Sequence, residues 1–148
     1  MTTENPNTTE EAEIRALVND RLVAIRLKDI NQLLYGYEPG ILSFDVVGPL
    51  QYSGSDAIRT RMKEWFSSFK GNIGLEISDL HITAGKDVAF QYCLNHVNGT
   101  KINGEKLDMW WRETIGYQKT GDKWIITHQH SSVPFDVNTG KASVDLQP

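Results

Sequence analysis

Two histidines stand two residues apart near the end of the chain, in the stretch WIITHQHSSVPFD at residues 124–136. A His-x-His pair in a β-strand can supply metal ligands, a general acid or base, or a hydrogen bond to a ligand. A metal centre needs a third and usually a fourth ligand, and no Glu follows His128 and His130 at short spacing. His81 and His96 belong to other segments, so we expect no metal site and no cofactor. Two alternatives stay open: catalysis by His130 with ligand binding by His128, or ordinary strand histidines at a pocket wall or subunit interface.

Asp45 is the second candidate, because it ends the apolar stretch ILSFD. A carboxylate in a mostly apolar cavity, with its pKa raised toward the working pH, can move a proton beside a carbonyl group. The plainer interpretation is a turn aspartate that caps the following VVGP turn through its backbone. Asp45 is therefore a candidate catalytic base with a structural alternative.

Two arginines lie where a cation needs a partner. Arg21 falls on or beside the apolar stripe of a predicted helix, so it must be paired or must face a polar cavity. Arg112 shares one face of a predicted strand with Trp110 and Thr114. If that face points inward, Arg112 can hold a carboxylate or phenolate by a bidentate contact. If it points outward, Arg112 can pair with an acidic residue of a neighbouring chain.

Aromatic residues indicate both a pocket and an interface. Tyr35, Trp65 and Trp110 are predicted to help line a hydrophobic ligand pocket, and their alternative place is the core. Trp111 and Tyr117 share the other face of the strand that carries Trp110. Aromatic side chains on the outer face of a sheet are typical of a buried contact between subunits, so we expect a homodimer through that face.

Periodicity predicts helices first and strands afterwards. The apolar repeat from Ile14 to Ile25 predicts a helix of about five turns. Asp29 caps a shorter second helix, and Gly71 with Gly74 closes a third. The strands expected after that helix are LEISDLHIT, DVAFQYCLNHV, KLDMWWRETIGYQK and WIITHQHSS. This order predicts an α+β fold, in which one strongly curved, mostly antiparallel sheet wraps around N-terminal helices and encloses a pocket.

Composition excludes several classes of function. The 148 residues suit one domain, and 39% hydrophobic with 23% charged residues is typical of a globular protein. A net charge of −4 argues against a nucleic-acid partner or an anionic membrane surface. No apolar run approaches the ~20 residues that span a bilayer. The single cysteine, Cys93, excludes an internal disulfide and a cysteine-based zinc site.

The chain divides into three parts. Residues 1–7 are expected to be a flexible tail, residues 8–136 a single domain, and residues 137–148 a C-terminal extension. The polar, acidic N-terminus has the character of neither a signal peptide nor a transit peptide. A cytoplasmic location follows as the expectation.

Three stretches resemble one superfamily. They are LKDINQLLYGYEPGILSFDVVGPLQYSGSDAIRTRM, WWRETIGYQKTGDKW and WIITHQHSSVPF. In that order and spacing the chain resembles the nuclear transport factor 2-like superfamily, which includes ketosteroid isomerases, SnoaL-like polyketide cyclases and a calmodulin-dependent kinase association domain. The resemblance covers roughly residues 8–136. It implies a cystatin-like cone with a small-molecule pocket, homodimers, and Asp45 at the position of the isomerase base.

The resemblance fails at the isomerase oxyanion hole. In the isomerases a tyrosine and a protonated aspartate form that hole. Counting along this chain puts the tyrosine position at Arg21 and the aspartate position near Thr114, and neither residue type matches. Steroid isomerisation is therefore not expected. One hypothesis is a SnoaL-like protein that binds an apolar carbonyl compound, with proton transfer or cyclase chemistry at Asp45. The alternative is a non-catalytic ligand-binding or dimerisation domain that resembles the kinase association domain, because this superfamily hosts both.

Overall fold

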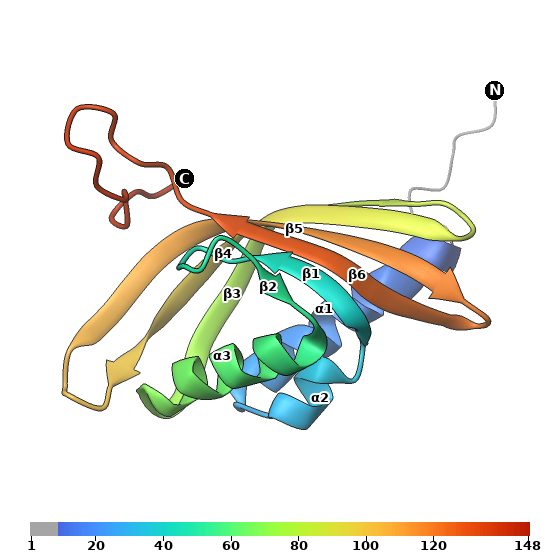
Figure 1. Ribbon diagram of the computed structural model, residues 1–148, viewed down its shortest axis with the longest axis horizontal. Coiled ribbons are helices and arrows are strands. Elements are labelled where there is room, and N and C mark those ends of the chain that lie inside the picture. Colours follow the sequence, from blue (N-terminus) through green and yellow to red (C-terminus); the bar gives the residue numbers. More distant parts are fainter. Residues whose placement is uncertain (1–8) are drawn as a thin grey trace.

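The structure is a computed structural model that describes residues 9–148 (Figure 1). Its elements in chain order are α1 (Thr9–Arg26), α2 (Ile30–Leu34), β1 (Tyr37–Phe44), β2 (Tyr52–Ser53), α3 (Ser55–Ser67), β3 (Phe69–Ala84), β4 (Val88–Lys101), β5 (Lys106–Thr120) and β6 (Lys123–Ser132). The expected tail at 1–7 lies outside the described residues. Within the described part, no helix combines the length and apolar character needed to cross a membrane.

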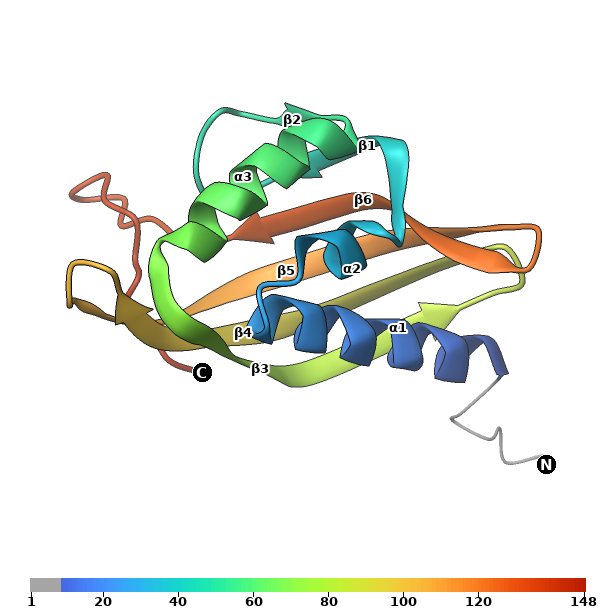
Figure 2. The same ribbon diagram turned by 90° about the horizontal axis from the view of Figure 1, so that it is seen from below.

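The strands form one curved, open sheet with the order β2-β1-β6-β5-β4-β3. Every neighbouring pair is antiparallel except β1 and β6, which run parallel. The three helices lie on the concave face of the sheet (Figure 2). The predicted α+β fold, with a curved and mostly antiparallel sheet around the helices, is confirmed.

Two element boundaries differ from the predicted ones. α3 ends at Ser67, where the Ser68 hydroxyl donates to the Trp65 carbonyl at 2.6 Å, so Gly71 and Gly74 lie within β3. Gly74 is required in that strand because a Cβ there would lie 2.8 Å from the Asn98 carbonyl oxygen. Gly74 therefore allows two strands to approach closely, whereas Gly71 adopts a positive φ of 65°, and neither glycine ends a helix.

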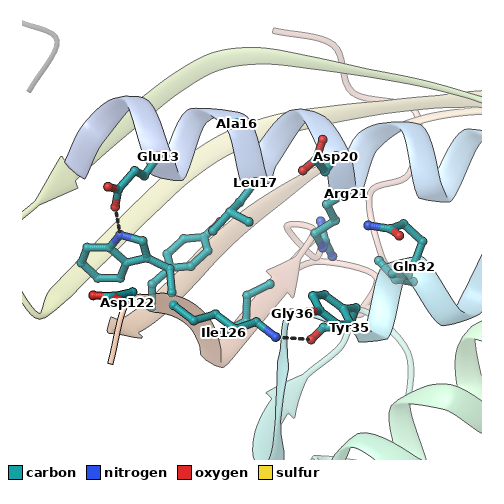
Figure 3. A pocket seen from close by; sticks show the side chains of 14 residues that line it. Glu13, Ala16, Leu17, Asp20, Arg21, Gln32, Tyr35, Gly36, Asp122 and Ile126 are labelled. Carbon is teal, nitrogen blue, oxygen red and sulfur yellow. Dashed lines mark hydrogen bonds between the residues drawn. The ribbon is translucent and has the colours of Figure 1, made fainter. Parts of the chain in front are cut away.

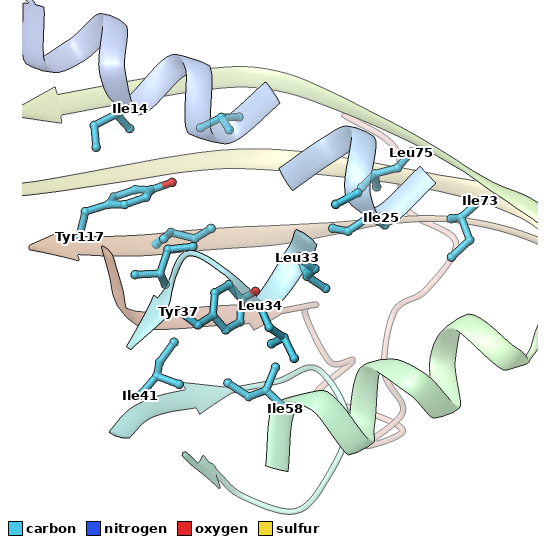
Figure 4. Close-up of a cluster of buried hydrophobic side chains, with 14 of the residues drawn as sticks. Ile14, Ile25, Leu33, Leu34, Tyr37, Ile41, Ile58, Ile73, Leu75 and Tyr117 are labelled. Carbon is cyan, nitrogen blue, oxygen red and sulfur yellow. The ribbon is translucent and has the colours of Figure 1, made fainter. Parts of the chain in front are cut away.

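The hydrophobic core fills the space between the concave face and the helices (Figure 4). α1 contributes Ile14 and Ile25, while β1 and β5 contribute Ile41 and Ile115, all at most 5% exposed. Strand alternation puts Trp111, Glu113, Ile115 and Tyr117 on this concave face of β5. The prediction that Trp111 and Tyr117 lie on the outer face is therefore wrong, because the helices cover the odd-numbered side of β5.

A β-bulge changes the facing of the last strand. Tyr117 pairs with Ile126, but Gly116 pairs with His128, so Thr127 is an extra residue in β6. Before the bulge the even-numbered residues face the core, and Ile126 is 6% exposed. After the bulge the odd-numbered residue Gln129 faces inward. The prediction that His128 shares a face with Ile126 is wrong for this reason.

Candidate functional site

A pocket of about 560 Å³ lies between α3, the concave side of β5 and the chain after β1. We call it the Trp65 pocket. The apolar side chains that form its walls include Met62, Trp65, Val97, Leu107, Met109 and Trp111. The rings of Trp65 and Trp111 meet edge to face, with centroids 6.2 Å apart. Its mostly apolar walls suit a small organic ligand.

Asp45 lies on the wall of this pocket directly after β1. Its Oδ2 accepts a hydrogen bond from Arg61 Nε at 3.1 Å, and its Oδ1 accepts one from the Val46 N–H at 2.6 Å. The carboxylate is thus both pocket-lining and bonded to its own turn.

Glu113 is the second carboxylate of the pocket, and its residue is 4% exposed. Its Oε1 lies 3.2 Å from Arg21 NH1 and 4.0 Å from Cys93 Sγ, whereas Oε2 has no partner among residues 9–148. Every fully buried side-chain nitrogen or oxygen in that range does have a hydrogen-bond partner. Oε2 is therefore not fully enclosed, and it opens to the pocket that Glu113 lines.

Arg21 and Glu113 are the centre of a buried polar network. Arg21 also donates to the Tyr37 hydroxyl at 3.3 Å and to Gln129 Oε1 at 3.5 Å. Tyr37 donates to the same Gln129 oxygen at 2.9 Å, and Gln129 Nε2 donates to Ser43 Oγ at 2.9 Å. The requirement that Arg21 be paired is confirmed, and four elements supply its surroundings.

Burial dominates the electrostatics of this network. Burial opposes the charge of Arg21 most strongly, but Glu113, Tyr37 and Tyr117 together outweigh it, so the guanidinium pKa lies above its ordinary value. Burial raises the pKa of Tyr37, and the neighbouring Arg21 partly offsets that rise. Burial and then the Glu113 charge raise the pKa of the Cys93 thiol to about 12. Cys93 therefore stays a neutral thiol at physiological pH, which argues against a nucleophilic role.

Two cations lie at the outer part of the Trp65 pocket. Arg61 is held by Asp45, whereas Lys101 Nζ donates to Ser68 Oγ at 2.9 Å and sits 4.1 Å from the centre of the Phe69 ring. Burial and then the charge of Arg61 lower the pKa of Lys101. The exposed Glu64 carboxylate also lines this end, so the mouth carries both signs of charge.

The C-terminal extension contributes to the same pocket. Phe135 and Ala142 form an isolated antiparallel bridge, and the Ser143 N–H donates to the Pro134 carbonyl at 2.7 Å. These bonds fold the chain back after β6, so that Ala142 and Val144 line the Trp65 pocket.

A second pocket, of about 490 Å³, lies beyond the Arg21–Glu113 pair (Figure 3). We call it the Trp124 pocket, and α1, the end of α2 and the β5–β6 turn surround it. Arg21 lines the Trp124 pocket, whereas Glu113 and Gln129 line the Trp65 pocket. The ion pair therefore separates two hollows inside the cone. Tyr35, expected to bind ligand, lines the Trp124 pocket and is 70% exposed.

Two predicted ligand-binding residues lie outside both pockets. Arg112 is exposed on the convex face of β5, where its Nε donates to Ser132 Oγ at 3.1 Å. Trp110 lies on the same face and stacks on His96, with ring centroids 4.4 Å apart. The expectation that Arg112 and Trp110 face the cavity is corrected, because the odd-numbered residues of β5 take the concave side.

The paired histidines also lie on the convex face. His128 Nδ1 is 2.6 Å from the Leu42 carbonyl oxygen, and both His128 and His130 contact the Phe44 ring edge to face. His130 and Asp45 do border one further hollow, of about 560 Å³, at the end of β6. Among residues 9–148, no three His, Cys, Asp or Glu side chains are grouped to hold a metal ion.

Comparison with known proteins places this architecture. The sequence model of the SnoaL-like domain matches residues 14–136. The chain belongs to the SnoaL-like domain family. A solved NTF2-like protein of unknown function from Pseudomonas putida KT2440 is 31% identical over 96% of this chain and 99% of its own, with a TM-score of 0.87. The predicted nuclear transport factor 2-like, SnoaL-like membership is confirmed.

More distant structures share the fold alone. A ketosteroid isomerase-like protein from Erwinia carotovora atroseptica is 19% identical over 85% of this chain and 97% of its own, with a TM-score of 0.72. The association domain of C. elegans CaMKII is 17% identical over 86% of this chain and 100% of its own, with a TM-score of 0.65. Among curated proteins, none matches the chain.

Reasoning from the sequence missed two residues of this SnoaL-like site, Glu113 and Arg61. Counting along β5 pointed to Thr114, which is exposed on the convex face. A signal for Glu113 was present, because it is the one carboxylate in the alternating apolar series of Trp111, Ile115 and Tyr117. A charge in such a series must be paired with an opposite charge.

We expect Arg21→Met to lower the free energy of unfolding by roughly 3–5 kcal/mol, because it leaves the buried Glu113 carboxylate without its cation. Arg15, on the same helix, is the matched control: its contact with Glu11 is 3.8 Å long and lies at the surface. Arg15→Met should change stability by less than about 1 kcal/mol. Urea titration followed by circular dichroism measures both variants, and equal effects would contradict a buried Arg21–Glu113 pair.

Proposed function

We propose that this SnoaL-like chain binds a small, flat and largely apolar molecule that carries an oxygen group, in the Trp65 pocket. The observation that carries the proposal is the Glu113 carboxylate, which is 4% exposed and yet presents one oxygen to an apolar-walled pocket. This oxygen accepts no hydrogen bond from the protein, so a ligand that donates one to it gains affinity. The aromatic walls at Trp65 and Trp111 favour a flat ligand.

Ser131 supplies a second polar group beside Glu113. The two residues are register partners on β6 and β5, and Ser131 lines the Trp65 pocket. Its hydroxyl has no hydrogen-bond partner among residues 9–148, so it can donate to a ligand oxygen or accept from one. A hydroxyl group on the ligand can therefore donate to Glu113 while it accepts from Ser131.

Proton transfer by Asp45 is the chemistry that we propose for this site. The Asp45 carboxylate would take a proton from the carbon beside a ligand carbonyl, the C–H electron pair would form the enolate C=C bond, and the carbonyl π pair would move onto the oxygen. Ser131 would donate to that oxygen, and Arg61 would hold Asp45 in place. His130 borders the hollow at the end of β6 with Asp45 and would exchange the proton with solvent.

Binding is tested with 2-naphthol and 2-methylnaphthalene, which match in shape but differ in the O–H donor. We expect 2-naphthol to raise the melting temperature more, and Glu113→Gln to weaken its binding on the order of tenfold, because the acceptor loses its charge. Glu64→Gln, at the exposed rim of the same pocket, is the matched control and should bind as wild type does. Equal responses to both compounds, or equal losses in both variants, would contradict the proposal.

Catalysis is tested with 2-tetralone, a flat ketone with exchangeable protons beside its carbonyl. The protein in D₂O should accelerate deuterium incorporation at those positions, as observed by NMR, and Asp45→Asn should reduce the rate by roughly a hundredfold or more because the base is lost. Asp56→Asn, an exposed change in the first turn of α3, should leave the rate unchanged. A rate in Asp45→Asn equal to that of wild type would overturn the role of Asp45.

The convex face of the sheet supports a second function, homodimerisation. Val88, Phe90 and Tyr92 on β4 are 63%, 44% and 47% exposed. Trp110 lies on the same convex face, further along the sheet, where it pairs with His96 of β4. Exposed aromatic and aliphatic side chains gathered on one sheet face are typical of a subunit contact. These residues, rather than Trp111, are the ones that we propose to meet a second copy. Arg112 and His128 would then belong to the association face.

Sedimentation equilibrium tests this association. We expect wild type to sediment at twice the 16.7 kDa chain mass at micromolar concentration. Tyr92→Glu should shift it to the single-chain mass, because a buried unpaired carboxylate opposes association. Leu50→Glu, at a residue that is 94% exposed outside this face, is the control and should remain dimeric. A wild-type monomer would reject the interface.

A further inference from the structure

The Trp124 pocket is lined by apolar side chains and by several charged ones, among them Arg21. The uncharged residues that line it include Ala16, Leu17, Leu33, Tyr117, Trp124 and Ile126. Figure 3 shows α1 along one side of the hollow, with the Arg21 side chain extending from that helix toward Tyr35 and Ile126. At about 490 Å³, it has the size of a small-molecule site.

Arg21 has hydrogen-bonding capacity left over on this side. Its guanidinium carries five N–H groups, and three acceptors among residues 9–148 use them: Tyr37, Glu113 and Gln129. One N–H on each terminal nitrogen is therefore spare. The Arg21 side chain is 16% exposed and lines the Trp124 pocket, so spare donors are available to a molecule in it.

The ion pair gives its two sides opposite hydrogen-bonding character. Glu113 presents an acceptor oxygen to the Trp65 pocket, whereas Arg21 presents donors to the Trp124 pocket. A ligand that donates suits the first pocket, and a ligand that accepts suits the second. The two pockets therefore offer a ligand opposite hydrogen-bonding groups, although one ion pair forms the wall between them.

Charge decides which kind of acceptor fits. The charged residues that line the Trp124 pocket are Glu13, Asp20, Arg21, Asp122 and Lys123. Glu13 is bound to the Trp124 indole N–H at 2.6 Å, and Arg21 already has Glu113 as its counter-ion. An anionic ligand would add a charge beside three carboxylates of the lining, whereas a neutral carbonyl adds none.

We propose that the Trp124 pocket is a second binding site, for a neutral, largely apolar compound with a carbonyl or similar acceptor oxygen that bonds to Arg21. This site lies on the other side of the ion pair from the proposed Trp65 site. It requires neither ligand binding nor proton transfer there.

The four tryptophans of the chain allow each surface to be observed separately. Trp124 lines the second pocket, Trp65 and Trp111 line the first, and Trp110 lies on the convex face. Titration of the full chain with 2-acetylnaphthalene, followed by the indole N–H signals in a ¹H–¹⁵N NMR spectrum, should give a saturable shift at Trp124. Single Trp→Phe variants assign the four signals.

The carbonyl is tested with 2-isopropenylnaphthalene, which replaces C=O by C=CH₂ and keeps the shape. We expect the ketone to bind at Trp124 roughly tenfold more tightly, because its oxygen accepts from a charged donor. Arg21→Met combined with Glu113→Gln removes both charges together and leaves no buried ion unpaired, and it should abolish the preference. Arg15→Met retains the Arg21 donor and its counter-ion and should keep the preference.

Three results would overturn the site: no saturable shift at Trp124, equal binding of ketone and hydrocarbon there, or a preference that persists in the double variant. A missing response of Trp65 and Trp111 to 2-naphthol is a different result, because it rejects the first pocket and leaves Trp124 unaffected. The failure of either site is therefore recognised independently of the other.

Discussion

The structure depends on one buried ion pair, Arg21 with Glu113. Removing two charges from water costs more than their attraction returns unless further hydrogen bonds satisfy them. Here Tyr37 and Gln129 supply acceptors to Arg21, and Ser43 in turn accepts from Gln129. The participants come from α1, β1, β5 and β6, so the pair can be satisfied only when the first helix sits correctly over three strands. The polar network thereby fixes the position of α1 over the sheet more strictly than apolar packing alone would.

The bulge at Thr127 makes that network compatible with the core. Without it, the alternation that buries Trp124 and Ile126 would turn Gln129 to the outside. With it, one strand supplies an apolar wall to the Trp124 pocket and then a polar group to the ion pair. The same step puts His128 and His130 on the convex face. The His-x-His spacing therefore reflects a change of register in the strand, and the two histidines lie outside both pockets.

Element types were predictable from the sequence because they follow from local periodicity, and the order of helices and strands then led to the fold class. The need for a partner at Arg21 was also predictable, since it rests on helix phase alone. The identity of that partner was not, because 92 residues separate Arg21 from Glu113 and no local pattern links them. Which side of β5 faces the helices could not be predicted either. Both sides of the strand carry a tryptophan, so hydrophobicity did not distinguish the concave face from the convex face. A bulge leaves no mark in the spacing of His128 and His130.

The two carboxylates of the Trp65 pocket are each held by an arginine, yet they are not equivalent. Arg61 and the Val46 N–H occupy both oxygens of Asp45, whereas Arg21 occupies one oxygen of Glu113. Each Asp45 oxygen thus keeps one acceptor site beside a bond already formed, whereas Oε2 of Glu113 accepts no bond from the described residues. Ala142 and Val144 of the C-terminal extension also line this pocket. Those residues lie after the SnoaL-like domain match at 14–136, so a part of the chain outside the shared domain forms part of the pocket wall.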